Sequence, residues 1–149
     1  MQPGRPWDTS IAKSSAVHSM GVVKLNQSGN STIMKKVCIL TTAHMPTDVR
    51  IYHHEAVSLA RVGYRVTIIA PWHRSELASE GIQIIAVKKP STRLGRFTQT
   101  AARIFKTAMS QRADIYHFHD PDLLPWMMLF SAMGKRVIYD VHEYNSKAS

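Results

Sequence analysis

Short apolar runs alternate with longer amphipathic segments along most of the chain beyond residue 34. Five aliphatic and β-branched runs have the length of strands, and their continuous hydrophobicity is typical of strands buried on both faces. These predicted strands span residues 37–40, 64–70, 82–87, 114–118 and 136–139. Helical spacing of apolar residues between them predicts helices at 49–62, 94–112 and 123–133. Strands that alternate with helices form right-handed βαβ units, so we predict an α/β fold with a doubly wound, Rossmann-like parallel sheet.

The predicted first helix has recognisable start and stop signals. Asp48 stands where a side chain caps a helix, and Gly63 stands just past its end. Gly134 ends the third helix in the same way. The expected apolar stripe of the first helix consists of Val49, Tyr52, Ala56, Leu59 and Ala60.

The N-terminal segment differs from the rest in composition. Residues 1–34 are rich in Ser, Gly, Asn and Gln and carry few large aliphatic side chains. Such segments bury too little apolar surface to offset the entropy of ordering, so we predict a disordered tail. Residues 35–149 then form one Rossmann-like domain, and we expect folding and native translation to begin at Met34.

Composition narrows the class of protein without selecting a ligand. The net charge of +9 favours an anionic partner, which can be nucleic acid, anionic lipid or a phosphorylated substrate. Cys38 is the single cysteine of the sequence and lies within an apolar run, which predicts a buried, unreactive thiol. The sequence shows neither a signal-peptide pattern nor an apolar stretch long enough to span a bilayer. A reducing, cytoplasmic location is therefore predicted.

Polar clusters follow three of the predicted strands. His44 comes after the first strand, His119 and Asp120 after the fourth, and His142 and Glu143 after the fifth. Open parallel sheets bind ligands beyond the carboxyl ends of their strands, where the strand order reverses. If the first strand lies beside the fourth, these groups surround one crevice.

Individual side chains in these clusters have both structural and functional interpretations. Strand alternation places His117 and His119 on one face, with His117 deeper and His119 at the mouth of the strand. His117 is equally well interpreted as a hydrogen-bonded core histidine, so His119 is the better ligand contact. Asp120 precedes a proline and is expected to shape the turn, while Asp122 can cap the next helix. Arg50 can meet a phosphate or carboxylate, or form a local salt bridge.

Two further patterns bear on phosphate and membrane binding. Neither GxGxxG nor GxxxxGK[ST] occurs in the sequence, so the usual glycine-rich phosphate cradles are lacking. The helix from Arg93 to Arg112 has an apolar stripe that begins at Leu94 and a basic face. Basic residues on that face are Arg96, Arg103 and Lys106. We expect this helix to pack on the sheet; a peripheral contact with an anionic membrane is the alternative.

Two stretches of the chain, KKVCILTTAHMPTDVRIYHHEAVSLARVGYRVTIIAP and DIYHFHDPDLLPWMMLFSAMGKRVIYDVHEY, resemble the N-terminal half of family-4 glycosyltransferases of the GT-B fold. The nearest variety is the bacterial kind associated with surface or capsular polysaccharide assembly. The resemblance covers Lys35 to about Tyr144. Its four motifs are H-x-x-x-D-V-R-I, L-A-x-x-G-Y-x-V-T, H-x-H-D-P-D-L-L-P and Y-D-x-H-E.

The resemblance implies retaining transfer of a sugar from a nucleotide-sugar donor to an acceptor hydroxyl, without a metal or other cofactor. The N-terminal domain of such enzymes mainly holds the acceptor, here a glycan or a lipid-linked sugar. By motif position, His119 is the catalytic residue that reaches the donor sugar and its leaving group. The remaining candidates for substrate binding are His44, Arg50, Asp120, His142 and Glu143.

The sequence also departs from the family pattern. Its first loop carries His44-Met45-Pro46 where many relatives have glycines that approach the donor phosphates. The family's C-terminal domain, which grips the nucleotide, has no counterpart in the 149 residues. We therefore expect the chain alone to be inactive and to require the missing C-terminal domain or a complementing subunit.

Two other functions stay open. A metal-dependent hydrolase would use His117 and His119, with His142 and Glu143 completing four ligands. A non-catalytic binding domain is the other alternative. Nucleic acid is a less favoured partner, because aromatic residues are not interleaved with the basic ones as stacking platforms require. The expected location is the cytoplasm, with the inner face of the plasma membrane as a peripheral site.

Overall fold

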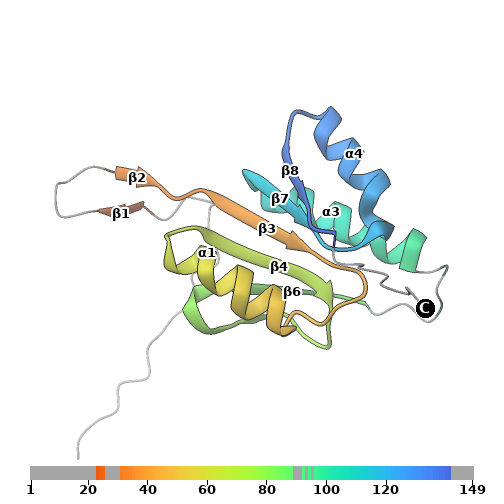
Figure 1. Ribbon diagram of the computed structural model, residues 1–149, viewed down its shortest axis with the longest axis horizontal. Helices are drawn as coiled ribbons and strands as arrows, with labels where there is room; N and C mark the ends of the chain where they lie inside the picture. Colours follow the sequence, from red (N-terminus) through yellow and green to blue (C-terminus); the bar gives the residue numbers. More distant parts are fainter. Residues whose placement is uncertain (1–22, 26–30, 89–91, 93, 95, 142–149) are drawn as a thin grey trace, which may run out of the picture. The chain divides into compact units, whose positions relative to one another are not determined.

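The computed structural model describes residues 23–25, 31–88, 92, 94 and 96–141 (Figure 1). The chain forms two compact units, Met1–Ile33 and Met34–Ser149. In the first unit, β1 (Val23–Leu25) and β2 (Ser31–Ile33) form an antiparallel pair in which Lys24 faces Thr32. These six residues are thus ordered as short strands. Met34 is also described, and the other residues of the predicted disordered tail lie outside the described ones, so the tail stays a prediction.

The second unit is built on one six-stranded sheet. Its strands are β3 (Lys36–Leu40), β4 (Arg65–Pro71), β5 (Glu76–Leu77), β6 (Gln83–Val87), β7 (Ile115–Phe118) and β8 (Arg136–Tyr139). The order across the sheet is β5-β6-β4-β3-β7-β8, and every neighbouring pair is parallel except β5 with β6. All five predicted strands and their parallel direction are confirmed. The short antiparallel strand β5 was not predicted.

Helical segments connect the parallel strands. The first is a π-helix, η1 (Val49–Ala56), that continues as α1 (Val57–Arg61). The second begins as a π-helix, η3 (Arg96–Thr100), and continues as α3 (Ala101–Gln111). The third begins as a 3₁₀ turn, η4 (Pro121–Leu123), and continues as α4 (Leu124–Ala132); a further 3₁₀ turn, η2, spans Ser79–Gly81. The three predicted helices are therefore present.

Helix ends follow the local chemistry of the sequence. Asp48 Oδ1 accepts a hydrogen bond of 3.0 Å from the backbone N–H of Arg50, which caps η1 as predicted. Gly63 and Gly134 take φ values of +96° and +73°, the left-handed conformation that glycine adopts at little cost after a helix.

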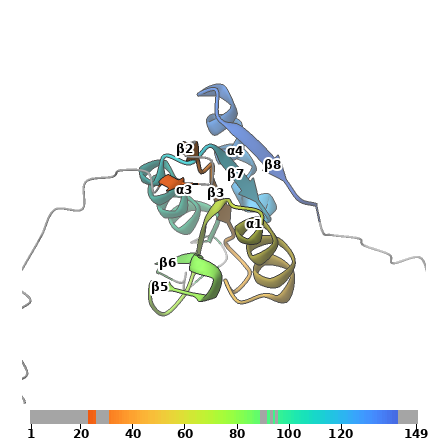
Figure 2. The same ribbon diagram turned by 90° about the vertical axis from the view of Figure 1, so that its left-hand side faces the viewer.

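The helices cover both faces of the sheet. On one face, α3 and α4 pack against side chains of β3 and β7 such as Cys38 and Tyr116, and Phe130 of α4 is fully buried there. On the other face, η1 and α1 pack against Ile39 and Ile68. Figures 1 and 2 show α1 and α3 on opposite sides of the strands. The fold is therefore a doubly wound, Rossmann-like α/β domain.

Two predicted apolar positions are exposed. Val49 is solvent-exposed, and the buried face of η1 is formed instead by Ile51, Tyr52 and Ala56. A π-helix has more residues per turn than an α-helix, which shifts the phase of the buried stripe. Leu94 precedes η3 and is 72% exposed, so the buried stripe of the second helical segment begins later than predicted.

The buried stripe of α3 otherwise agrees with the sequence pattern. Ala101, Ile104 and Ala108 are buried, while Arg103 and Lys106 are exposed. The packing of this helix on the sheet is therefore confirmed. The side chain of Arg96 lies outside the described ones. Among the described helices, none has the length and apolar character needed to cross a membrane.

Cys38 makes the stability of the domain sensitive to alkaline pH. Its side chain is fully buried in β3, and this burial raises the pKa of the thiol well above its ordinary value of 9.0. Above pH 9 the unfolded chain therefore loses a proton that the folded chain retains, and the free energy of unfolding falls by up to about 1.4 kcal/mol per pH unit. Urea unfolding between pH 8 and 10.5 measures this slope, which is expected to be shallower in Cys38→Ala. Identical slopes would contradict the assignment.

Candidate functional site

The carboxyl ends of β3, β7 and β8 meet at one edge of the sheet. Because β7 lies between β3 and β8, Phe118 is in register with Leu40 on one side and Tyr139 on the other. The backbone continues this pairing past the strand ends: His119 N–H donates to the Leu40 carbonyl, and Asp140 N–H donates to the Phe118 carbonyl. The predicted adjacency of the first and fourth strands is thus confirmed, and the strand order reverses between β3 and β7.

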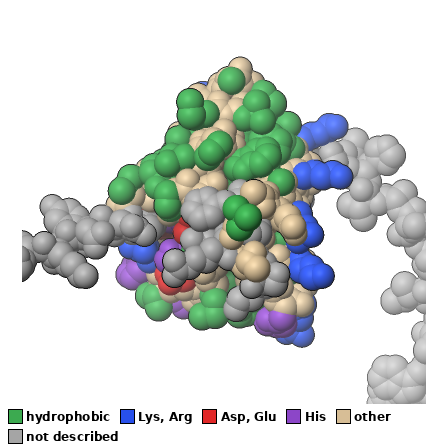
Figure 3. All heavy atoms as spheres, turned by 90° about the vertical axis from the view of Figure 1, so that its right-hand side faces the viewer, with side chains coloured by type: hydrophobic (Ala, Val, Ile, Leu, Met, Phe, Trp, Pro, Cys, Tyr) green, Lys and Arg blue, Asp and Glu red, His purple; other side chains and the backbone are tan. Residues whose placement is uncertain are grey.

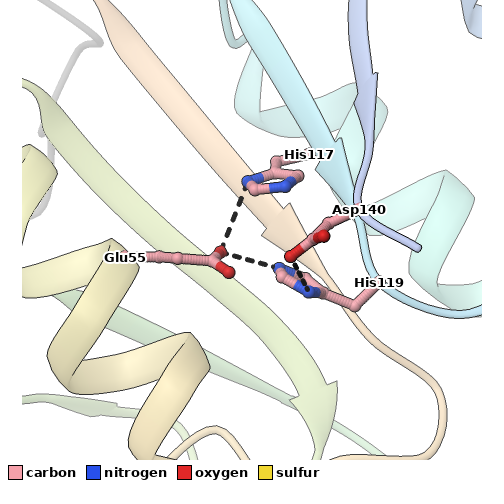
Figure 4. Close-up of side chains that lie close together, drawn as sticks. All are labelled: Glu55, His117, His119 and Asp140. Carbon is pink, nitrogen blue, oxygen red and sulfur yellow. Dashed lines mark ion pairs between the residues drawn. The ribbon is translucent and has the colours of Figure 1, made fainter. Parts of the chain in front are cut away.

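Two imidazoles and two carboxylates gather at this edge (Figure 4). Glu55 reaches from η1 toward the sheet, and its Oε2 lies 2.9 Å from His119 Nε2 and 3.4 Å from His117 Nδ1. Asp140 Oδ2 approaches the other side of His119, 4.0 Å from Nδ1. The rings of His117, in β7, and His119, directly after it, lie 4.5 Å apart between centroids, on one face as strand alternation predicts. We call these four residues the imidazole–carboxylate cluster.

The cluster is largely buried, with its more open side at Asp140. The His119 side chain has no solvent exposure, Glu55 is 17% exposed and Asp140 is 36% exposed. A carboxylate this shielded is stable only when charged or hydrogen-bonding groups compensate for lost hydration. Two ring nitrogens lie within 3.4 Å of Glu55 Oε2, although neither donates a hydrogen bond of regular geometry to it. The Asp140 side is the more open approach for a ligand.

Sequence reasoning named His119 as a candidate but missed Glu55 and Asp140. The signal for Glu55 was present: it directly precedes buried Ala56, three residues after buried Tyr52, so a charged side chain stands beside the apolar face of a helix. Asp140 was visible as the residue directly after the fifth predicted strand. Its contact with His119 depends on strand order, which the sequence does not determine.

Asp120 connects the loop after β3 to the end of β7. Its buried Oδ2 accepts hydrogen bonds from the Thr41 hydroxyl at 2.6 Å, from Thr42 N–H at 2.8 Å and from Ala43 N–H at 3.4 Å. The Thr42 hydroxyl donates to Asp122 Oδ2 at 3.1 Å. Asp120 therefore has a structural role, consistent with the turn-shaping interpretation, and Asp122 supports the same loop.

His44 and Arg50 lie near this edge but outside the imidazole–carboxylate cluster. His44 Nε2 is 3.6 Å from Asp120 Oδ1, and His44 Nδ1 is 3.9 Å from Asp48 Oδ2. Arg50 is exposed in the first turn of η1, where its N–H is bound by Asp48. His142 and Glu143 lie outside the described residues. The substrate-binding roles predicted for these residues stay predictions.

A parallel sheet with polar side chains gathered where its strand order reverses is the ligand-binding arrangement of Rossmann-like domains. Residues 49–148, more than half of the chain, match the family model described as Glycosyltransferase Family 4. The chain belongs to this glycosyltransferase family. No curated protein and no solved structure matches the chain. All four residues of the imidazole–carboxylate cluster lie within the matched segment, whereas His44 precedes it.

Proposed function

We propose that the chain is the acceptor-side, N-terminal half of a retaining GT-B glycosyltransferase. It would act in the transfer of a sugar from a nucleotide-sugar donor to an acceptor hydroxyl during polysaccharide or glycolipid assembly, with no metal in the reaction. The observation that carries this proposal is the position of His119: buried where the strand order reverses, with carboxylates near both ring nitrogens. Family membership favours sugar transfer over the metal-dependent hydrolase.

Glu55 and Asp140 would prepare His119 for a sugar. The Glu55 carboxylate, whose Oε2 lies 2.9 Å from His119 Nε2, would hold the ring in place. The 4.0 Å between His119 Nδ1 and Asp140 Oδ2 is too long for a direct hydrogen bond. A hydroxyl oxygen can lie about 2.8 Å from both atoms at once, so a sugar hydroxyl could bridge them.

The chemical contribution of the ring depends on its protonation state. A protonated imidazole donates from Nδ1 to a substrate oxygen, and its charge stabilises a departing phosphate. A neutral imidazole with its proton on Nε2 accepts a hydrogen bond from a sugar hydroxyl instead. In both states the substrate enters beside Asp140, the more exposed carboxylate of the cluster.

Saturation-transfer NMR on the purified chain tests this proposal. The panel contains nucleotide sugars, oligosaccharides and short-chain lipid-linked sugars, because the chain would hold the acceptor and contact the donor sugar. Saturable binding of at least one class is expected, with a loss of at least about tenfold in affinity in His119→Ala. The exposed His73→Ala serves as the control. Binding that is equal in all three proteins, or absent for every ligand, would overturn the proposal.

We also propose that the sheet edge at β8 receives the complementing polypeptide. β8 is an edge strand, and exposed apolar side chains lie along it and along α4. They are Met128, Leu129, Met133, Ile138 and Val141. Figure 3 shows hydrophobic side chains gathered over the part of the molecule where Figure 1 places α4 and β8. Within the described part of the chain no strand pairs with the outer side of β8, and such an edge beside an apolar surface is suited to an added strand and a covering helix.

The isolated chain is therefore expected to self-associate through this surface. Sedimentation velocity should detect species larger than a monomer as the concentration increases, and Met128→Lys together with Ile138→Lys should restore the monomer. Val62→Lys is the matched control, since Val62 is 72% exposed at the end of α1, far along the chain from this surface. A monomer at every concentration would contradict the proposal.

A peripheral location at an anionic membrane remains a proposal for the basic face of α3. Arg103 and Lys106 are both exposed there. Replacing both with Gln is expected to weaken co-sedimentation with phosphatidylserine vesicles by about thirtyfold, at about 1 kcal/mol per basic residue. The pair Lys135→Gln and Arg136→Gln removes the same charge from another exposed site. If both double variants lose vesicle binding equally, the net charge of the chain explains the binding and the basic face of α3 has no special role.

A further inference from the structure

The imidazole–carboxylate cluster has the composition and spacing of a metal site. One ligand atom from each of Glu55, His117, His119 and Asp140 lies within 4.8 Å of the other three. Ligand atoms around a tetrahedral zinc ion lie about 3.3 Å apart, because each bond is about 2.0 Å long. The contacts of Glu55 Oε2 with the two imidazoles, 2.9 and 3.4 Å, are close to that spacing.

Hydrogen bonding alone leaves part of this arrangement unexplained. Glu55 Oε2 is buried and receives no hydrogen bond of regular geometry within the described part of the chain, although two ring nitrogens lie within 3.4 Å of it. Ligand atoms this close together without a regular hydrogen bond between them are suited to a shared cation. As metal ligands, two carboxylates and two neutral imidazoles carry a charge of −2, which one divalent ion balances.

We propose that these four residues bind a zinc-class divalent transition ion. Two imidazole nitrogens and two carboxylate oxygens suit Zn²⁺ or Co²⁺, whereas Ca²⁺ requires six to eight oxygens and Mg²⁺ retains most of its waters. His117 comes from β7 and His119 directly follows this strand, and η1 supplies Glu55 from the layer that covers this face of the sheet. Asp140, the most exposed of the four, provides the remaining ligand oxygen, which lies within 4.8 Å of the other three ligand atoms.

The ion is separate from the proposed transfer reaction. It would bind His119 Nε2 and Glu55 Oε2, the two atoms whose contact otherwise holds the imidazole in position for a sugar. Metal and sugar ligands therefore compete for the site. His117 distinguishes the two functions, because the metal requires it while the proposed sugar contacts involve His119 and Asp140.

Titration of the metal-free, untagged chain with CoCl₂ tests the proposal. One equivalent of Co²⁺ is expected to produce the intense visible absorption of a tetrahedral site, and ZnCl₂ should displace it. His117→Ala and Glu55→Gln should each weaken binding at least about tenfold. His54→Ala is the control, because His54 is exposed on the same helix and is a plausible place for adventitious binding.

Three results would overturn the metal site. They are an absence of binding by the unmodified chain, equal affinity in His117→Ala, and a loss confined to His54→Ala. If the variants do not fold, the unmodified chain still decides: ZnCl₂ at saturating concentration should raise its midpoint of thermal unfolding, and an unchanged midpoint contradicts the proposal. Sugar binding that persists in His117→Ala while Co²⁺ binding is lost would separate this proposal from the proposed function.

Discussion

Replacing Asp120 with alanine is expected to lower the free energy of unfolding by about 3 kcal/mol. The carboxylate accepts hydrogen bonds from the Thr41 hydroxyl and from two backbone N–H groups, and Thr41 and Thr42 are themselves buried. Alanine would leave the Thr41 hydroxyl and the Thr42 N–H without an acceptor, at about 1–3 kcal/mol for each buried group. Urea unfolding followed by circular dichroism measures the change.

Two further variants separate this network from a general effect of removing a carboxylate. Asp120→Asn keeps an acceptor oxygen without the charge and should lose about half as much stability. Asp114→Ala removes a carboxylate that is exposed and accepts one backbone hydrogen bond, from Lys36 N–H at 2.7 Å. Its cost is expected to be about 1 kcal/mol. Equal costs for Asp114→Ala and Asp120→Ala would show that the loop after β3 does not depend on Asp120.

Glu55 and His119 are expected to act as one unit in ligand binding. Glu55→Gln keeps the size of the side chain but removes the charge that faces His119 Nε2 at 2.9 Å. It should therefore weaken sugar binding by about tenfold, nearly as much as His119→Ala, and the double variant should be little worse than either. Titration calorimetry of the four proteins with the strongest-binding sugar gives the coupling energy, which we expect to exceed about 1 kcal/mol.

If the losses of binding free energy in the two single variants add up in the double variant, this prediction is wrong, because the two residues then contribute to binding independently. Glu80→Gln provides the control: Glu80 also pairs with a basic side chain, Arg61, but this ion pair is exposed and joins η2 to α1. Exposed pairs contribute little, so Glu80→Gln should leave the affinity unchanged. If Glu80→Gln loses as much sugar affinity as Glu55→Gln, the change in net charge explains the loss and the contact with His119 does not.

Local patterns in the sequence were sufficient to predict most of the fold. The two inner strands β3 and β4 are continuous apolar runs buried on both faces, and Gly63 and Gly134 end helices through a conformation that few other residues adopt readily. The hydrophobic pattern gave wrong or missing predictions where a helix is not α-helical and where a strand is very short. The π-helical turn of η1 exposes Val49, and two residues are too few for β5 to show any periodicity.

The candidate site was predictable only in part, because it is assembled from distant segments. Strand-end positions pointed to His119, and its place beside the end of β3 follows from the sheet order. Glu55 comes from a helix 62 residues upstream of His117, counted along the sequence, and no local pattern links the two. The same is true of the three donors to Asp120, which belong to a loop about 78 residues away.

The most direct test of the site is imidazole NMR of the ¹⁵N-histidine-labelled chain. Because Glu55 lies against both rings, Glu55→Gln should shift the ring resonances of His117 and His119 together and leave exposed His73 unchanged. Adding the sugar that binds should then shift His119 more than His117 in the unmodified chain. If Glu55→Gln leaves both rings unperturbed, the two histidines and the glutamate do not form one site, and the argument for a sugar-binding centre at this edge fails.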